Sequence, residues 1–180
     1  NYTGNRLTAS LGGGLNQYRG NNFGKVTWVK NYIGNLSPEH EYYRNKSKKT
    51  DGNIYLKANY DLTSTLSAYA DLQYRYVSYE AWGVNDNYIS AEDGMQPIDV
   101  DKQYHFFNPR AGLSYTLADR NEFYFSFAVA QKEPTRSDFT DRHMFAEDDS
   151  YPSSEKLCDY ELGYTYTAPR LRLGVNLYYM

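Results

Sequence analysis

Residues 66–76, LSAYADLQYRY, decide the fold, because polar and apolar side chains alternate along them with every charge in one set. Leu66, Ala68, Ala70, Leu72, Tyr74 and Tyr76 form the first set, and Ser67, Tyr69, Asp71, Gln73 and Arg75 form the second. Successive side chains of a β-strand point to opposite faces, so a period of two predicts a strand with one apolar and one charged face.

The same alternation recurs elsewhere in the chain, weakest in its first segment. The other six segments are 7–16, 53–60, 110–117, 123–130, 159–166 and 171–179. Alternation over runs of this length is typical of strands that have one face in an apolar medium. We therefore predict about seven strands.

The connections between these strands differ strongly in length. Short segments rich in turn-forming residues occur at 61–64, 118–121 and 167–170, whereas long polar connections occupy 17–49, 80–102 and 132–156. Short periplasmic turns and long external loops are typical of outer-membrane barrels, whose tilted spanning strands need about 9 to 11 residues. The fold class predicted is all-β, an antiparallel up-and-down transmembrane β-barrel segment.

Aromatic residues favour the same interpretation. The chain has 21 Tyr, 8 Phe and 2 Trp in 180 residues, yet its mean hydropathy is −0.79. Tyr and Trp rings suit a membrane–water interface, where one side of the ring meets lipid and the other meets water. We expect Tyr74, Tyr76, Tyr79 and Trp82 to form such an interfacial girdle. A soluble β-sandwich that binds carbohydrate through its rings is the alternative.

Charge and chemistry motifs exclude several other classes. Basic residues number 19 and acidic residues 22, spread along the chain, which gives no reason to expect a nucleic-acid partner. The run Gly12-Gly13-Gly14 is not followed by the Gly-Lys-Ser/Thr of a phosphate loop, and no nucleophile elbow or metal-ligand pair occurs. We expect no enzyme activity and no catalytic, cofactor-binding or metal-binding residues.

Charged side chains on the predicted strands all belong to the polar set, which would face the barrel lumen. There they would form a structural network or contact a plug or solute. These lumen-lining residues are Asp71, Arg75, Arg110, Asp159, Glu161 and Arg172.

Two stretches, 125–139 (FSFAVAQKEPTRSDF) and 152–164 (PSSEKLCDYELGY), resemble the late-barrel region of TonB-dependent outer-membrane receptors. In that family an aromatic strand leads into an "fRaPt" segment, a loop, an "lkPEks" stretch and a strand of the type "yElGl.y". Glu133-Pro134-Thr135 corresponds to the middle segment, and the closing residues 173–180 (LGVNLYYM) resemble the next strand of receptors from Bacteroidetes. The chain departs from the pattern where Ser153-Ser154 interrupts the Pro-Glu pair and where Lys132-Glu133 replaces Arg-Ala.

The resemblance implies energised import of a scarce nutrient such as an iron chelate, a cobalamin or a glycan. It implies outer-membrane lipid, the TonB complex and a surface lipoprotein as partners, with TonB contacted through parts of the receptor outside this chain. Residues 1–180 would then be a partial barrel domain in the bacterial outer membrane, with the plug domain and the remaining strands elsewhere. A passive porin or an outer-membrane enzyme is the competing membrane class.

Overall fold

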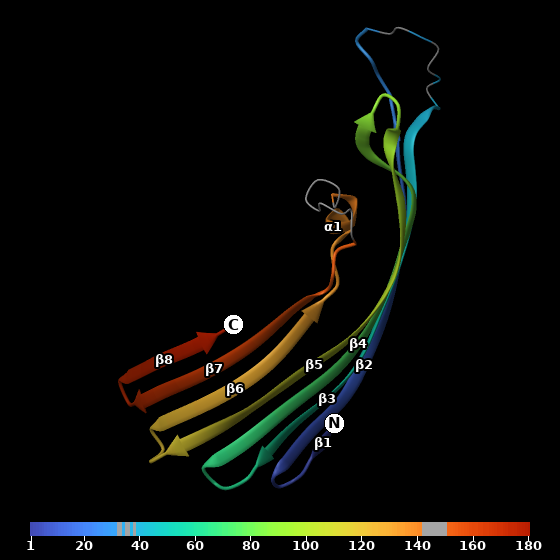
Figure 1. Ribbon diagram of the computed structural model, residues 1–180. Helices are drawn as coiled ribbons and strands as arrows, with labels where there is room; N and C mark the ends of the chain where they lie inside the picture. The colour runs from blue at the N-terminus through green and yellow to red at the C-terminus, as the bar shows by residue number, and fades with distance from the viewer. Residues whose placement is uncertain (32–33, 35–36, 38, 142–150) are drawn as a thin grey trace.

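The computed structural model describes residues 1–31, 34, 37, 39–141 and 151–180. They form one curved antiparallel sheet whose strands follow one another in sequence order, with one short helix inside the curve (Figure 1). The elements are β1 (Tyr2–Thr3), β2 (Leu7–Lys25), β3 (Glu41–Asp61), β4 (Leu66–Ser90), β5 (Gly94–Leu117), β6 (Asn121–Lys132), α1 (Arg136–Thr140), β7 (Glu155–Ala168) and β8 (Leu171–Tyr179). The predicted all-β, up-and-down class is confirmed, and the two-residue β1 adds an eighth strand. Over the described residues β1 pairs only with β2 and β8 only with β7, so the sheet is open.

Strand register keeps the predicted polar and apolar sets on opposite faces. Leu72 lies opposite Leu56 and Pro109, whereas its neighbour Asp71 lies opposite Lys57 and Arg110. We call the face that carries Asp71 the inner face and the face that carries Leu72 the outer face. The inner face lies on the side of the helix.

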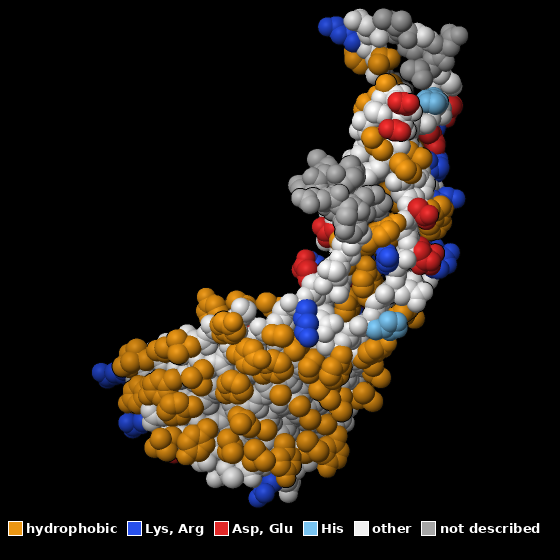
Figure 2. Space-filling view, viewed as in Figure 1, with side chains coloured by type: hydrophobic (Ala, Val, Ile, Leu, Met, Phe, Trp, Pro, Cys, Tyr) orange, Lys and Arg blue, Asp and Glu red, His pale blue; other side chains and the backbone are white. Residues whose placement is uncertain are grey.

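The outer face is apolar and exposed. Leu72, Phe125 and Leu173 are 42%, 45% and 54% exposed, and apolar side chains cover the lower part of the sheet (Figure 2). In a soluble sandwich these side chains would pack in a dry core between two sheets. The described residues form one sheet with no second layer over this face, so the sandwich alternative is wrong.

Four strands are much longer than the sequence predicts. β2 to β5 run for 19 to 25 residues, so the expected long connections 17–49 and 80–102 are wrong for most of their length. They are instead strand extensions that rise above the rest of the sheet (Figure 1). Both faces of the extensions are polar in places, as where Lys48 and Lys49 lie opposite Glu80 and Tyr79. Strand pairing therefore continues into segments where polar and apolar residues no longer alternate.

The predicted short turns are confirmed within a residue or two. The β5–β6 turn places Ala118 and Asp119 at φ values of 52° and 53°. Residues with side chains rarely adopt this left-handed conformation, which tight hairpins require.

Three inner-face glycines each lie directly opposite a tyrosine whose ring covers them. A Cβ added to any of these glycines would meet the ring. The Gly and Tyr partners are Gly12 with Tyr55, Gly112 with Tyr69, and Gly163 with Tyr124. Such pairs cover exposed backbone with an aromatic ring and help to fix strand register.

Buried apolar side chains gather on the inner face of the β4–β5 extension, where Ala81, Ile98 and Val100 pack against Phe139 of α1. The lower sheet has no comparable core among the described residues, because its apolar side chains are on the outer face. In the described part of the chain, no helix has both the length and the apolar character needed to cross a membrane.

Candidate functional site

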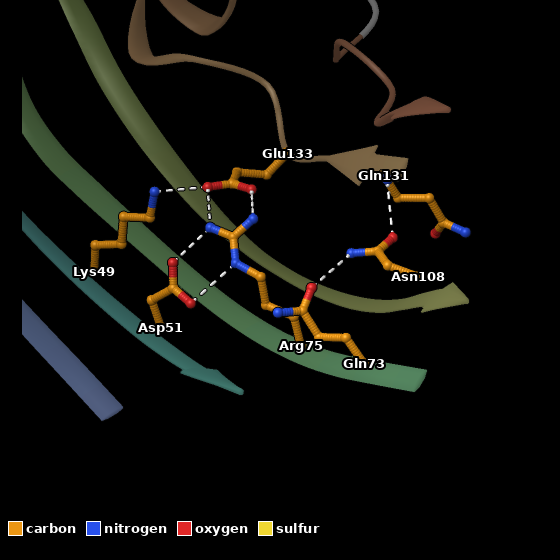
Figure 3. A network of polar contacts seen from close by, with 7 residues as sticks. All are labelled: Lys49, Asp51, Gln73, Arg75, Asn108, Gln131 and Glu133. Carbon is orange, nitrogen blue, oxygen red and sulfur yellow. Dashed lines mark hydrogen bonds and ion pairs between the residues drawn. The ribbon is translucent and has the colours of Figure 1, made fainter. Parts of the chain in front are cut away.

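The site begins where β6 separates from β5. Pairing of β5 with β6 ends at Arg110 and Ala128, while β6 stays paired with β7 as far as Lys132. Side chains then bridge the widening gap. The Gln131 N–H donates to Asn108 Oδ1 at 2.9 Å, and Asn108 Nδ2 donates to Gln73 Oε1 at 3.3 Å (Figure 3).

Glu133, the first residue after β6, reaches across the inner face to β3 and β4. Its Oε1 accepts from Lys49 Nζ at 2.6 Å, and its two oxygens accept from Arg75 Nη2 and Nη1 at 3.1 and 2.9 Å. Arg75 also forks onto Asp51, with Nε to Oδ1 at 3.0 Å and Nη2 to Oδ2 at 2.5 Å (Figure 3). We call Lys49, Asp51, Arg75 and Glu133 the Glu133 cluster.

The Glu133 cluster contains two cations and two anions, so its formal charge is balanced. Glu133 is only 8% exposed, and a buried carboxylate is costly unless it is paired and hydrogen-bonded. Burial would raise the pKa of Glu133, but hydrogen bonds from Lys49, the backbone and Arg75 hold that pKa below its ordinary value. Glu133 is therefore ionised at neutral pH, and its ion pairs hold the segment after β6 against β3 and β4.

Helix α1 follows this tie and docks on the same inner face. The Phe139 ring stacks on Tyr79 with centroids 5.9 Å apart and is 4% exposed. Arg136 Nη2 donates to Asn45 Oδ1 at 2.9 Å, and Gln96 Nε2 donates to the Thr140 carbonyl at 2.6 Å. Residues 133–141, which we call the inner segment, are thus held along their length against β3, β4 and β5.

The start of α1 is fixed locally by its own sequence. Asp138 Oδ2 accepts from the Thr135 backbone N–H at 2.6 Å and from Thr135 Oγ1 at 2.8 Å. Hydrogen bonds from the Thr135 side chain and backbone lower the pKa of Asp138. Pro134 precedes this cap, which suits a chain that must leave a strand and start a helix.

Among the hollows lined by described residues, two lie on the inner face beside this site. One, of about 140 Å³, lies beside α1 and is lined by Tyr79, Gln96, Ile98, Arg136 and Phe139, among others. The other, of about 330 Å³, lies lower on the wall and is lined mainly by polar side chains. Its polar lining is Asn53, Tyr55, Lys57, Asp71, Gln73, Asn108 and Arg110.

The six residues predicted to line the lumen all have inner-face register. Asp71, Arg110, Ala128 and Asp159 form one row across β4 to β7. The Lys57 Nζ and Asp71 Oδ2 atoms are 3.6 Å apart.

The remaining lumen-lining residues are more scattered. Glu161 Oε2 accepts from the Tyr124 hydroxyl at 3.3 Å, and Asp159 Oδ1 is buried without a hydrogen-bond partner among the described residues. Arg172, opposite Thr167, lies near the β7–β8 turn. Arg75 alone of the six belongs to the Glu133 cluster.

Sequence reasoning missed Lys49, Asp51 and Glu133. The alternation of 53–60 could have been extended back to Asp51 and Lys49, which share the inner face with Asn53. No local signal shows that Glu133 meets Arg75, because 58 residues separate them along the chain.

The four residues predicted to form the girdle do not all lie on one face. Tyr74 and Tyr76 lie on the outer face, and the Tyr74 hydroxyl is 2.6 Å from His105 Nδ1. Trp82 shares that face, three alternate positions further along β4. Tyr79 lies on the inner face against Phe139, because an odd position must face away from Tyr74 and Tyr76.

No group of three or more His, Cys, Asp or Glu side chains able to hold a metal ion occurs within the described ranges.

Comparison with known proteins gives a family and a fold. Residues 1–180 match the family model "TonB dependent receptor-like, beta-barrel". No curated protein matches the chain. Among solved structures, the chain is similar to the ferric-catecholate import receptor Fiu from E. coli K12. In the open form the TM-score is 0.66 at 16% identity, and in the closed form 0.57 at 13%. The alignments cover 98% of this chain and 28% and 29% of the Fiu chains, respectively.

Proposed function

This chain belongs to the TonB-dependent receptor-like β-barrel family, and we propose that it is part of the wall of an outer-membrane receptor that imports a scarce nutrient. The family resemblance expected from residues 125–139 and 152–164 is confirmed. The chain spans 28% of the length of the Fiu chain in its open form, so the activity of a whole receptor is a proposal here.

The observation that carries the proposal is the contrast between the two faces of one sheet. The outer face exposes aliphatic side chains such as Leu72, which suits acyl chains, and the inner face carries paired charges and amides. A closed sheet would satisfy every backbone group within lipid, so the open edges at β1 and β8 call for further strands. We propose that these strands and a plug domain belong to the same receptor.

We propose that the six lumen-lining residues and the Glu133 cluster contact the plug or the passing solute. The inner segment narrows the space inside the curve of the wall, where a solute arriving from outside would pass. Tyr74 and Tyr76, at the upper end of the apolar outer face, would lie at the external membrane interface. The TonB complex and a surface lipoprotein are the partners proposed for the whole receptor, and we propose no catalytic activity.

The nutrient class is tested most directly in the host cell. Its receptor gene would be deleted, and uptake of a labelled ferric chelate, a cobalamin and a glycan would be compared with and without TonB. Because Fiu is named as a ferric-catecholate importer, a ferric catecholate is the first chelate to test. We expect one substrate to require both the receptor and TonB.

Arg110→Gln on the inner wall should lower that uptake, whereas Arg170→Gln, in the β7–β8 turn, should leave it unchanged. Uptake that needs the receptor but not TonB would identify a passive porin. If uptake of all three substrates is unchanged when the receptor gene is deleted, the proposal is overturned.

A further inference from the structure

The upper part of β5 has a strand on one side only. Pairing of β5 with β6 ends at Arg110 and Ala128, and after Lys132 the chain turns toward α1, inside the curve of the sheet (Figure 1). Within the described ranges, the β5 residues that precede Arg110 pair with β4 alone. We call residues 99–107 the open edge, which is about 27 Å long at the usual rise per residue.

Pro109 explains why the pairing with β6 stops there. In an antiparallel pair, alternate residues direct their backbone groups toward the same neighbouring strand. The Thr116 N–H donates to the Thr65 carbonyl at 2.8 Å, so even-numbered residues of β5 face β4 and odd-numbered residues face the β6 side. The next odd position after Ala111 is Pro109, which has no N–H to donate to β6.

Side chains cover the two ends of the open edge. The Tyr151 hydroxyl donates to the Asp99 carbonyl at 2.9 Å, and Gln131 Nε2 donates to the Phe107 carbonyl at 3.3 Å. Between these ends, three odd residues direct backbone N–H and C=O groups away from β4, with no hydrogen-bond partner in the described part of the chain. They are Asp101, Gln103 and His105. Such an edge can bind an extended peptide through main-chain hydrogen bonds.

Carboxylates line the outer side of the open edge. Asp99 and Asp101 are exposed and make no ion pair among the residues that the structure describes. Glu80 lies opposite Asp101 and pairs with Lys48 at 3.2 Å. Opposite charges on neighbouring strands stabilise a sheet, so a strand added beside β5 would gain from basic side chains on this face.

Apolar side chains dominate the inner side of the same edge. Val100 and Phe106 are 6% and 2% exposed, and the Tyr104 ring stacks on Phe106 with centroids 5.7 Å apart. Lys102, between Val100 and Tyr104, places its Nζ 4.3 Å from the centre of the Tyr151 ring. Successive side chains of an added strand would point to opposite sides, so its inner side chains would extend this apolar row.

We propose that the open edge binds an extended segment of a partner protein by strand addition, and that this segment alternates basic and apolar residues. Its basic side chains would lie beside Asp99 and Asp101, and its apolar side chains beside Val100 and Tyr104. A second copy of this chain is a poorer occupant, because its own open edge would add carboxylates to an acidic surface.

The test uses the full-length receptor in detergent and three eight-residue peptides as probes. In the first peptide Lys alternates with Val, and in the second Glu replaces Lys. The third has the first sequence but is N-methylated throughout, which removes every main-chain donor. Fluorescence anisotropy of labelled peptide measures affinity, and hydrogen exchange measures protection of the β5 amides. We expect only the first peptide to bind and to slow exchange at Asp101, Gln103 and His105.

The variant Gln103→Pro removes one donor from the open edge, and Gln103→Ala is its matched control. Strand β5 already carries proline at two odd positions, Pro97 and Pro109, so the variant should keep its pairing with β4. We expect Gln103→Pro to bind the first peptide about 10-fold more weakly, the effect of one lost hydrogen bond, and Gln103→Ala to bind like the wild type. Circular dichroism checks that both variants keep the β-sheet signal.

The double variant Asp99→Asn/Asp101→Asn tests the charge and does not depend on the proline variant. It should bind the first peptide about 5-fold more weakly, the effect of two exposed cross-strand ion pairs. Asp61→Asn/Asp119→Asn, which removes the same charge near the turns at the opposite end of the sheet, should bind like the wild type.

Equal binding of the Lys and Glu peptides would overturn the charge assignment, and equal binding of the N-methylated peptide would overturn strand addition. Slow exchange at Asp101, Gln103 and His105 without peptide would mean that the receptor itself covers the edge, which rules out a partner there. If no peptide binds, the carboxylates only guard the edge against pairing, and the proposal is overturned. Nutrient uptake is a separate readout, so none of these results decides the proposed import function.

Discussion

At the scale of single residues, Glu133 is the key contact because it joins a segment outside the sheet to two strands within it. Its bonds to Lys49 and Arg75 are charge-assisted, and such bonds are stronger than neutral ones. Arg75 is also held by Asp51, whose two hydrogen bonds fix the orientation of the guanidinium that Glu133 contacts. The contacts of Glu133 therefore depend on correct pairing of β3 with β4, which places Lys49, Asp51 and Arg75 together.

The substitution Glu133→Gln should loosen the inner segment. The side chain keeps its size but loses the charge that Arg75 and Lys49 require, so the free energy of local opening should fall by about 1 to 3 kcal/mol. Hydrogen exchange of the amides in 135–141 in the full-length receptor measures this. Glu92→Gln, at an exposed position in the β4–β5 turn, is the matched control. If the amides in 135–141 exchange equally slowly in the Glu133 variant and the wild type, the ion pairs of Glu133 do not hold the inner segment.

Acid should loosen the same segment. The pKa of Glu133 lies below its ordinary value of 4.5, so its contribution is complete above about pH 4.5 and is lost as the pH falls through the lower folded value. Protection factors in 135–141 should be constant from neutral pH to about pH 5 and fall below pH 4.5.

The Glu133→Gln variant is the control for this acid response. It should lose part of the response but not all, because the pKa of Asp138 is also lowered and its bond to Thr135 still titrates. An identical pH profile in wild type and variant would argue against the assignment to Glu133.

At the scale of elements, α1 is too short to be stable alone, since isolated helices of a single turn do not form in water. Its position depends on the Thr135 and Asp138 cap and on Phe139, which fills a place between Tyr79 and the β4–β5 extension. The β4–β5 extension supplies the apolar surface on which Phe139 packs. Extension and helix therefore stabilise each other.

Removing the ring tests this dependence. Phe139→Ala should weaken docking of the inner segment by about 3 to 5 kcal/mol, the usual cost of a buried Phe, and leave the sheet intact. Trypsin cleavage after Arg136 in the folded full-length receptor, followed by mass spectrometry, reports the freed segment. Phe23→Ala, at a half-exposed ring on β2, should cleave like the wild type. Equal cleavage of both variants would mean that Phe139 does not hold the helix.

At the scale of the whole molecule, one sheet presents two chemically different faces along most of its length. The outer face is apolar below and charged above, and the inner face is mainly polar on the wall, with buried apolar side chains at Val77, at Phe106 and where α1 packs. The boundary on the outer face lies near Tyr74 and Tyr76. We therefore expect the sheet to accept a charged substitution on the inner face but not in the apolar part of the outer face.

Two neighbouring residues of β5 test this asymmetry. Leu113 lies on the outer face between Ala68 and Phe125, and Ser114 lies on the inner face between Ser67 and Tyr124. Leu113→Arg should destabilise the receptor in lipid vesicles by about 2 to 4 kcal/mol, whereas Ser114→Arg should cost much less. Urea titration of the folded fraction of the full-length receptor in vesicles compares the two. Equal losses would contradict the assignment of the faces.

Local sequence is enough to predict which way the residues of the expected strands face, because facing depends only on odd or even position. Residues 66–76 were enough to separate Leu72 from Asp71, and the six lumen-lining residues share one face for the same reason. The short turns and the family resemblance were also visible in local patterns.

The strand lengths and the contacts of the inner segment depend on how the strands pair and pack. Alternation fades above the apolar band because both faces carry polar side chains there, so the sequence predicts loops where β2 to β5 extend. Glu133 meets Lys49 across 84 positions, a contact set by register and by where β6 leaves β5. Facing is a property of one strand, whereas a contact between distant residues depends on how several strands align, and no local pattern records that alignment.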